Sequence, residues 1–174
     1  MHPAILQFVQ FKREHAEAVL SWKYPPPYEL YSSLQPTSEE SVAQLLAPEL
    51  NYRAVLDENR GLIAFRCYGV DARVAGGAYE DEALDLGGGL RPDLTGQGLG
   101  KHVIAAAMAY AWDRFHPRLF RVTIATFNTR ALKTYERLGY QKASCFIRPA
   151  DGREFTILTK VAAVPELQIP MRVS

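Results

Sequence analysis

The chain has 174 residues, of which 48% are hydrophobic and 22% are charged. These proportions are typical of one soluble globular domain and exclude disordered, collagen-like and coiled-coil chains. The formal net charge of +1 excludes a nucleic-acid-binding surface over the whole domain, and no apolar run approaches the roughly 18 residues that cross a bilayer.

Neither end of the sequence nor its cysteines indicate export. The first residues lack a cationic region and a sufficiently long apolar core, so no signal peptide is expected. Cys67 and Cys145 stand inside apolar, strand-like runs and are expected to be core residues of a reduced, cytoplasmic protein, with a single disulfide as the alternative.

The first half of the chain alternates between helical and strand patterns. A helix is expected over residues 12–23. Thr37 with Glu40 forms a capping box for a second, short helix that ends at Pro48. Three strands are expected next, at residues 52–56, 62–68 and 84–90.

The second half contains two well-marked helices. The first is expected over residues 98–115, and the strand that follows it, residues 120–127, is nearly apolar, as in a strand covered on both faces. Asn128 is expected to cap the second helix, and Gly139 to end it in the left-handed conformation.

The final strands, residues 144–148 and 154–160, flank an Asp-Gly hairpin signal. The order of elements predicts a single α/β domain over residues 1–161 with a mixed sheet, in which the strands before and after the long helix are parallel. The tail, residues 162–174, is an edge strand, a partner contact or a disordered segment, and the sequence leaves these alternatives open.

The most informative motif is a glycine-rich turn between a strand and the long helix. Gly96, Gly98 and Gly100 remove the Cβ atoms that would block a ligand, and they permit positive φ. The amides of this turn then meet the positive end of the helix dipole, where phosphate oxygens bind. The spacing does not fit a dinucleotide fingerprint, and Thr95 and His102 stand where a P-loop needs Gly and Ser or Thr. A turn that only packs against the sheet is the alternative.

Two motifs resemble those of the GNAT acetyltransferase superfamily. The first is Thr95-Gly96-Gln97-Gly98-Leu99-Gly100, which is similar to the family's pyrophosphate motif, Gln/Arg-x-x-Gly-x-Gly/Ala, and departs from it at Thr95. The second is similar to the family's Asn-x-x-Ala-x-x-x-Tyr-x-x-x-Gly-Phe/Tyr through Asn128, Ala131, Tyr135, Gly139 and Tyr140. Both occur in the family's order, and the resemblance covers residues 84–146.

This resemblance implies a GNAT-like fold and acetyl-CoA as the cofactor. The implied sheet is mixed but mostly antiparallel, with six to seven strands, helices on both faces, and a central parallel strand pair that splays apart to admit acetyl-CoA. The implied cofactor-binding residues are Gly88, Gly89, Leu90, Thr95, Gly96, Gln97, Gly98, Leu99, Gly100, Lys101, Asn128, Ala131 and Tyr135.

The resemblance also implies an N-acetyltransferase in which a primary amine attacks the thioester directly. Tyr135 is then the acid that protonates the leaving thiolate, and backbone N–H groups near Gly89 and Leu90 stabilise the oxyanion. Asp85 is the candidate general base, although it is one residue out of phase on its strand unless a bulge corrects it. A water chain is the alternative base.

The acceptor is expected to be a small-molecule or peptide amine, with no nucleic-acid or membrane partner, and the enzyme a monomer or homodimer. The segment between the first two helices borders the acceptor site in this family. Its candidate substrate-binding residues are Trp22, Tyr24, Tyr28 and Tyr31. The alternative is that these rings close the core under a long loop.

The histidines and a basic stretch are the remaining charged features of the sequence. The histidines at positions 2, 15, 102 and 116 show no metal-ligand spacing, so no metal is expected. A basic stretch over residues 118–142 is expected to be mostly solvated, with some of it near the 3′-phosphate of CoA.

The alternative to an enzyme is a non-catalytic CoA-binding sensor.

Overall fold

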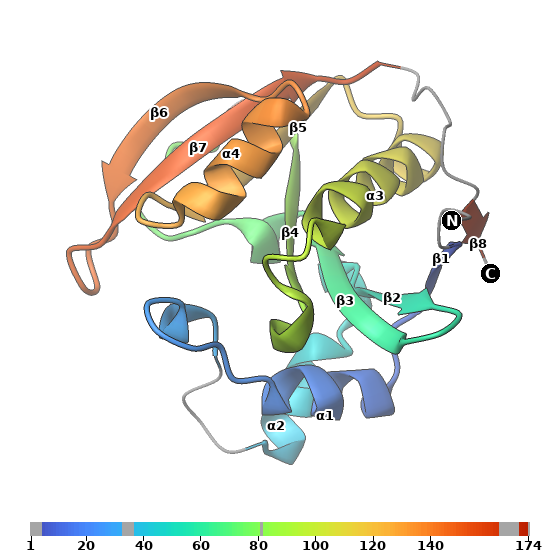
Figure 1. Cartoon of the computed structure of the whole chain (residues 1–174). Coiled ribbons are helices and arrows are strands. Elements are labelled where there is room, and N and C mark those ends of the chain that lie inside the picture. Colours follow the sequence, from blue (N-terminus) through green and yellow to red (C-terminus); the bar gives the residue numbers. More distant parts are fainter. Residues whose placement is uncertain (1–4, 33–36, 81, 164–170, 174) are drawn as a thin grey trace.

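The computed structural model of the chain describes residues 5–32, 37–80, 82–163 and 171–173. In these residues the strands form one mixed sheet of eight strands in the order β6-β7-β5-β4-β3-β2-β1-β8 (Figure 1). The strands are β1 (Leu6–Gln10), β2 (Arg53–Asp57), β3 (Gly61–Tyr68), β4 (Leu84–Leu90), β5 (Leu119–Ala125), β6 (Gln141–Ile147), β7 (Glu154–Val161) and β8 (Met171–Val173).

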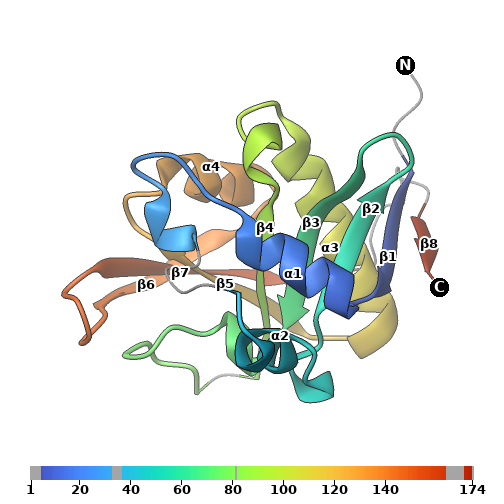
Figure 2. The same ribbon diagram turned by 90° about the horizontal axis from the view of Figure 1, so that it is seen from below.

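Helices cover both faces of this sheet. Helices α1 and α2 lie on one face, and α3 and α4 lie on the other (Figures 1 and 2). The helices are α1 (Arg13–Ser21), α2 (Glu39–Leu45), α3 (Leu99–Phe115) and α4 (Thr129–Arg137), with short 3-10 helices η1 (Glu29–Tyr31), η2 (Pro48–Leu50), η3 (Val70–Ala72) and η4 (Pro92–Leu94). No helix in the described part of the chain is long and apolar enough to cross a membrane.

The predicted fold class is confirmed, but the sequence analysis missed β1, and residues 171–173 of the tail form an edge strand, which was one of the three alternatives for that segment. The sequence analysis did not assign β1, in which Leu6 and Phe8 are buried in the alternating pattern of a strand that is covered on one face. The short β8 pairs with β1 in parallel at the sheet edge. The rest of the predicted tail beyond residue 163 lies outside the described residues.

Two local expectations were wrong. Helix α2 is capped by Ser38 and Ser41, which exchange hydrogen bonds between side chain and backbone N–H, rather than by the predicted Thr37 and Glu40. Cys145 is exposed, because β6 is an edge strand that pairs with β7 alone. Cys67 is buried as predicted, and both thiols are free.

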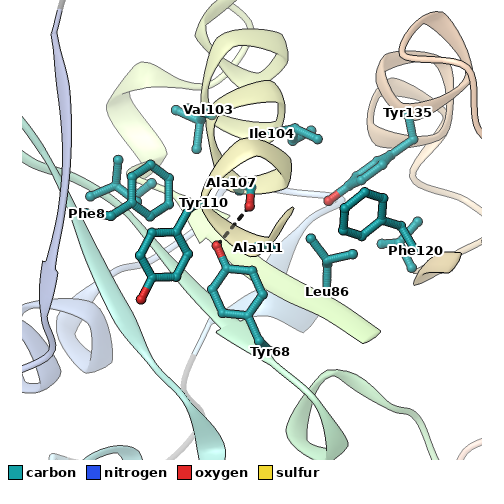
Figure 3. Close-up of a cluster of buried hydrophobic side chains, with 14 of the residues drawn as sticks. Phe8, Tyr68, Leu86, Val103, Ile104, Ala107, Tyr110, Ala111, Phe120 and Tyr135 are labelled. Atoms are coloured by element: carbon teal, nitrogen blue, oxygen red, sulfur yellow. Dashed lines mark hydrogen bonds between the residues drawn. The ribbon is translucent and has the colours of Figure 1, made fainter. Parts of the chain in front are cut away.

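The two faces of the sheet have separate cores. On the α3 face, Tyr68 and Leu86 pack with Phe8, Tyr110 and other apolar side chains, and the Tyr68 hydroxyl donates a hydrogen bond to the Ala107 carbonyl (Figure 3). On the α1–α2 face, the neighbouring β3 residue Cys67 packs with residues of α1, α2 and β2. Alternate residues of a strand therefore belong to different cores.

The parallel pairing of β4 with β5 is short, and this opens the sheet at its centre. Leu84 pairs with Phe120 and Asp85 with Arg121, after which no pair joins the two strands although β4 continues to Leu90. Beyond this point β5 pairs only with β7, on its other side. The two central strands therefore diverge, as expected for this fold.

A buried ion pair holds the strands together at the last paired position. Asp85 accepts two hydrogen bonds from the Arg121 guanidinium, at 2.5 and 2.8 Å, and a third from Arg73 Nε at 2.8 Å. Asp85 and Arg121 are 1% and 2% exposed. Buried charges are stable only when they are paired and hydrogen-bonded. This contact therefore ties β4 to β5 at the last position where the two strands pair.

We predict that Asp85→Asn destabilises the fold by about 3–5 kcal/mol, because it leaves the Arg121 charge buried without its counter-ion. Chemical denaturation gives the free energy of unfolding. The matched control is Asp93→Asn, which breaks the exposed pair of Asp93 with Arg91 and should leave the midpoint almost unchanged. An unchanged midpoint in Asp85→Asn would contradict the structural role of this carboxylate.

Candidate active site

A cavity of about 420 Å³ lies where β4 and β5 have separated, beside the N-terminal ends of α3 and α4. It is bounded by β3, β4, the glycine turn, α3, α4 and the segment between α1 and α2. The lining residues are Tyr24, Tyr28, Tyr31, Phe65, Arg66, Gly88, Gly89, Leu90, Thr95, Gly96, Gly98, Gly100, Lys101, Val103, Ile104, Asn128, Arg130, Ala131, Thr134, Tyr135 and Arg137.

The glycine turn leaves room on the side of the cavity. Gly98, the N-cap of α3, has φ of +82°, a conformation that favours glycine. A Cβ added at Gly98 or Gly100 would meet no protein atom within 4 Å, although both residues line the cavity. The missing side chains therefore leave open space in front of the first amides of α3, which have no partner within the helix.

Side chains brace this turn from within. The Thr95 hydroxyl donates to the Pro92 carbonyl at 2.8 Å, and Gln97 Nε2 donates to the Asp93 carbonyl at 2.7 Å. Thr95, the position that departs from the family motif, thus supports the loop locally.

Two of the predicted cofactor-binding residues, Gln97 and Leu99, do not line the cavity. Gln97 is exposed, and Leu99 packs against the core.

Two cationic side chains lie near the same turn. Lys101 follows it directly in α3, and a Cβ at Gly96 would lie 3.7 Å from Arg130 Nη1. The Arg130 guanidinium also lies 4.4 Å from the centre of the Tyr28 ring. The first amides of α3, the open space and these two cations suit the phosphates of a ligand such as CoA.

The other arginines of the basic stretch lie elsewhere. Arg137 lines the cavity from the last turn of α4. Arg121, which was expected in the same solvated stretch, is instead buried against Asp85.

Asn128 both caps α4 and lines the cavity. Its Oδ1 accepts a hydrogen bond from the Ala131 N–H at 3.1 Å, which confirms the predicted N-cap. Its Nδ2 donates to the Tyr31 hydroxyl at 3.0 Å. This side chain therefore links α4 to the segment that precedes α2.

Tyr135 enters the cavity from α4. The residue is 5% exposed, and its hydroxyl is directed toward Leu86 and α3 (Figure 3). The hydroxyl accepts a hydrogen bond from Arg66 Nη2 at 3.1 Å, and the ring meets the Tyr140 ring edge-on with centroids 5.1 Å apart. These two contacts fix both the ring and its oxygen.

The phase of β4 decides which of its backbone groups face the gap. Two hydrogen bonds to β3 or to the residue after it fix this phase, one at each end of β4. The Asp85 carbonyl accepts a hydrogen bond from the Gly69 N–H, and the Arg91 N–H donates one to the Ile63 carbonyl. Alternation along the strand then directs the N–H groups of Gly88 and Leu90 toward the gap. Of the two amides predicted as oxyanion donors, the Leu90 N–H therefore faces the gap, whereas the Gly89 N–H faces β3.

The side chain of Asp85 lies outside the cavity. No register shift interrupts the pairing of β3 with β4, so no bulge corrects the phase of Asp85. Its oxygens are occupied by Arg121 and Arg73, and it does not line the cavity. The prediction that Asp85 is the general base therefore does not fit this geometry.

An aromatic wall closes one side of the cavity. Tyr24, Tyr28 and Tyr31 line it as predicted, whereas Trp22 packs against Phe65, with ring centroids 6.0 Å apart, outside the lining. Burial raises the pKa of Tyr24, so its hydroxyl stays protonated and donates to the Leu90 carbonyl at 2.8 Å. The segment between α1 and α2 is thereby tied to β4.

Several lining residues were not predicted from the sequence. They are Phe65, Arg66, Val103, Ile104 and Thr134. The sequence does contain one indication for Arg66. It is the single charged residue of the apolar strand β3, and a charged residue is rarely buried unless it has a partner. Among the described residues no group of His, Cys, Asp and Glu could hold a metal ion.

Comparisons with known proteins agree with this geometry. The model of the acetyltransferase (GNAT) domain matches residues 6–141. The fold is similar to that of a GNAT-family acetyltransferase from Bacillus anthracis, with a TM-score of 0.70 and 13% identity over 93% of this chain and 98% of that chain. It is also similar to a spermidine N-acetyltransferase from Vibrio cholerae in complex with CoA and spermine, with a TM-score of 0.61 and 16% identity over 90% of this chain and 95% of that chain. No curated protein sequence matched the chain.

We predict that Gly100→Val weakens the binding of CoA about tenfold or more, equivalent to ~1.4 kcal/mol, because the new side chain fills the open space at the turn. Isothermal titration calorimetry measures the dissociation constant. His102→Val is the control, since it introduces the same side chain in the same helical turn at an exposed position outside the cavity. Equal affinities in the two variants would argue against a ligand at this turn.

Proposed function

Because this chain belongs to the GNAT acetyltransferase family, and is therefore an acyltransferase, we propose that it transfers the acetyl group of acetyl-CoA to a primary amine. One observation carries this proposal. A glycine turn suited to phosphates and a buried phenol, Tyr135, line the same cavity between the diverging strands. A phenol in the wall of the cavity can donate a proton to a bound thioester, a step that acyl transfer needs and CoA binding alone does not.

The proposed cofactor site follows from the charges and the open space of the cavity. The first amides of α3 would bind the pyrophosphate, with Lys101 and Arg130 supplying positive charge beside it. The N–H and C=O groups on the gap side of β4 would bind the pantetheine arm, as a neighbouring strand would. Asn128 borders the same path from α4.

When bound there, acetyl-CoA supplies a thioester that a neutral amine attacks. The N–H groups of Gly88 and Leu90 would stabilise the negative charge that develops on the carbonyl oxygen. The Tyr135 hydroxyl would donate its proton to the sulfur as the carbon–sulfur bond breaks. The nitrogen would lose its proton to water, because no Asp, Glu or His lines the described cavity.

The aromatic wall favours an acceptor amine attached to an apolar or aromatic group. Tyr24, Tyr28 and Tyr31 present aromatic rings to the cavity, and the wall adjoins the β4 backbone through the hydrogen bond of Tyr24 to Leu90. The Vibrio protein was solved with spermine, a polyamine, so polyamines are the natural comparison. Ring faces bind both apolar groups and isolated cations.

The function is tested by measuring free thiol released from acetyl-CoA in the presence of an arylalkyl amine, spermidine, or a short peptide with a free N-terminus. We expect the arylalkyl amine to give the highest kcat/KM, with acetylated product found by mass spectrometry. Preference for spermidine would overturn the acceptor class only. Binding of CoA without thiol release for any amine would overturn the enzymatic proposal in favour of a sensor.

We predict that Tyr135→Phe lowers kcat by roughly 10²-fold or more while the dissociation constant of CoA changes little, because only the proton donor is removed. Steady-state kinetics with the best acceptor and calorimetry with CoA provide the two measurements. The control is Tyr140→Phe, since the Tyr140 hydroxyl is buried next to Tyr135 without a hydrogen-bond partner in the described part of the chain and does not line the cavity. An equal kcat in both variants would exclude Tyr135 as the acid.

A further inference from the structure

Arg66 is a buried cation in the wall of the cavity. The residue is 4% exposed and stands on β3. Its guanidinium is always protonated at neutral pH, and burying such a charge costs free energy unless a partner compensates for it. The proposed function, as described so far, gives this charge no role.

The hydrogen-bond partner of Arg66 is a phenol. Its Nη2 donates to the Tyr135 hydroxyl oxygen at 3.1 Å, and its Nε is buried without a partner in the described residues. No ion pair of the described residues joins Arg66 to a carboxylate. This contrasts with Arg121, which is equally buried but bound to Asp85.

Gly88 makes room for Arg66 to cross β4. The two residues are directly opposite each other in the β3–β4 pairing. A Cβ at Gly88 would lie 2.9 Å from Arg66 Cδ and 3.0 Å from Arg66 Nη1, and 2.2 Å from the Phe65 carbonyl oxygen. Any side chain there would displace the arginine, so the glycine on β4 and the arginine on β3 form one arrangement that reaches Tyr135 on α4.

The direction of this hydrogen bond constrains the phenol. A tyrosine hydroxyl has one hydrogen to donate, and an arginine has no acceptor atom. Because Arg66 occupies the acceptor side of the Tyr135 oxygen, the phenol hydrogen points away from Arg66. The edge-on contact with Tyr140 keeps the ring from turning. The hydrogen is therefore available to a group in the cavity that Tyr135 lines.

The geometry points to Arg66 as the positioning residue of the acyl transfer, an inference that rests on the proposed function. As the amine nitrogen bonds to the acetyl carbon, the carbon–sulfur bond breaks, and its electron pair goes to sulfur. Sulfur takes the Tyr135 proton, and the phenolate that remains is stabilised by the adjacent guanidinium. Solvent then returns a proton to the phenolate, in balance with the proton that the nitrogen has lost to water.

A double-mutant cycle tests whether Arg66 acts through Tyr135. We expect Arg66→Met to lower kcat about 10- to 100-fold with little change in the KM for acetyl-CoA, and Arg66→Lys, which keeps the charge, to recover part of the loss. In a Tyr135→Phe background the same Arg66→Met change should have almost no further effect, since the effects of residues that act as a unit are not additive. Multiplicative losses in kcat would overturn the inference.

A second readout needs neither acetyl-CoA nor an acceptor. With tyrosines labelled with ¹³C at Cζ, the resonance of Tyr135, assigned by its loss in Tyr135→Phe, reports the hydrogen bond to its oxygen. Arg66→Met should move this resonance. Arg53→Met is the matched control, because Arg53 Nε donates to the Tyr110 hydroxyl at 2.7 Å away from the cavity. It should move the Tyr110 resonance and leave that of Tyr135 and kcat unchanged.

The outcomes separate this inference from the proposed function. Absence of acetyl transfer by the unaltered protein would contradict the proposed function, whatever the spectra show. An active protein whose Arg66→Met variant keeps its kcat would overturn the role of Arg66 alone. If Arg66→Met does not fold, the same double-mutant cycle is run with Arg66→Gln, which removes the charge but keeps an N–H donor. A loss in kcat that is as large in the Tyr135→Phe background as in the unaltered protein, or no loss in either background, would overturn the inference.

Discussion

The buried pair of Asp85 and Arg121 is the contact on which the rest of the site depends. It lies at the last position where β4 and β5 are hydrogen-bonded neighbours, and beyond it the two strands separate. A parallel pair that continued to Leu90 would leave no gap, and the backbone groups of β4 would be occupied by β5. The ion pair thus joins β4 and β5 at the position beyond which they separate, and the Asp85 carboxylate has a structural role because Arg121 and Arg73 occupy its oxygens.

The open end of the gap is shaped by residues without side chains. In the turn before α3, glycines leave room in front of the helix amides, and on β4 Gly88 leaves room for a side chain of the neighbouring strand. The same residue type therefore serves two purposes within one strand–turn–helix unit. Arg66 occupies the space at Gly88 and donates a hydrogen bond to Tyr135. This hydrogen bond connects β3 of the sheet to α4.

The cavity combines two kinds of wall. The first amides of α3 and cations line it at the glycine turn, and tyrosine rings line it on the segment between α1 and α2. The two walls meet where the Arg130 guanidinium lies over the Tyr28 ring. The first wall suits a polyanion and the second suits an organic group, so two different ligands could share the cavity.

Local patterns were sufficient to predict most of this protein. The cap of α4 at Asn128, the glycine stop at Gly139 and the strand–turn–helix unit around Gly98 follow from conformational preferences that act over a few residues, and both cavity-lining motifs lie in such segments. The partners of Asp85 and Arg66 could not be predicted from local patterns. Each is a charged residue in an apolar strand, and its role depends on the partner that the fold brings to it: an arginine 36 residues away for Asp85 and a tyrosine 69 residues away for Arg66. The sequence by itself determined the motifs and the fold family. Only the tertiary structure decided which buried charge joins the two central strands and which one contacts Tyr135. The physical reason is that strand phase and pairing, not local sequence, select the neighbour of a buried side chain.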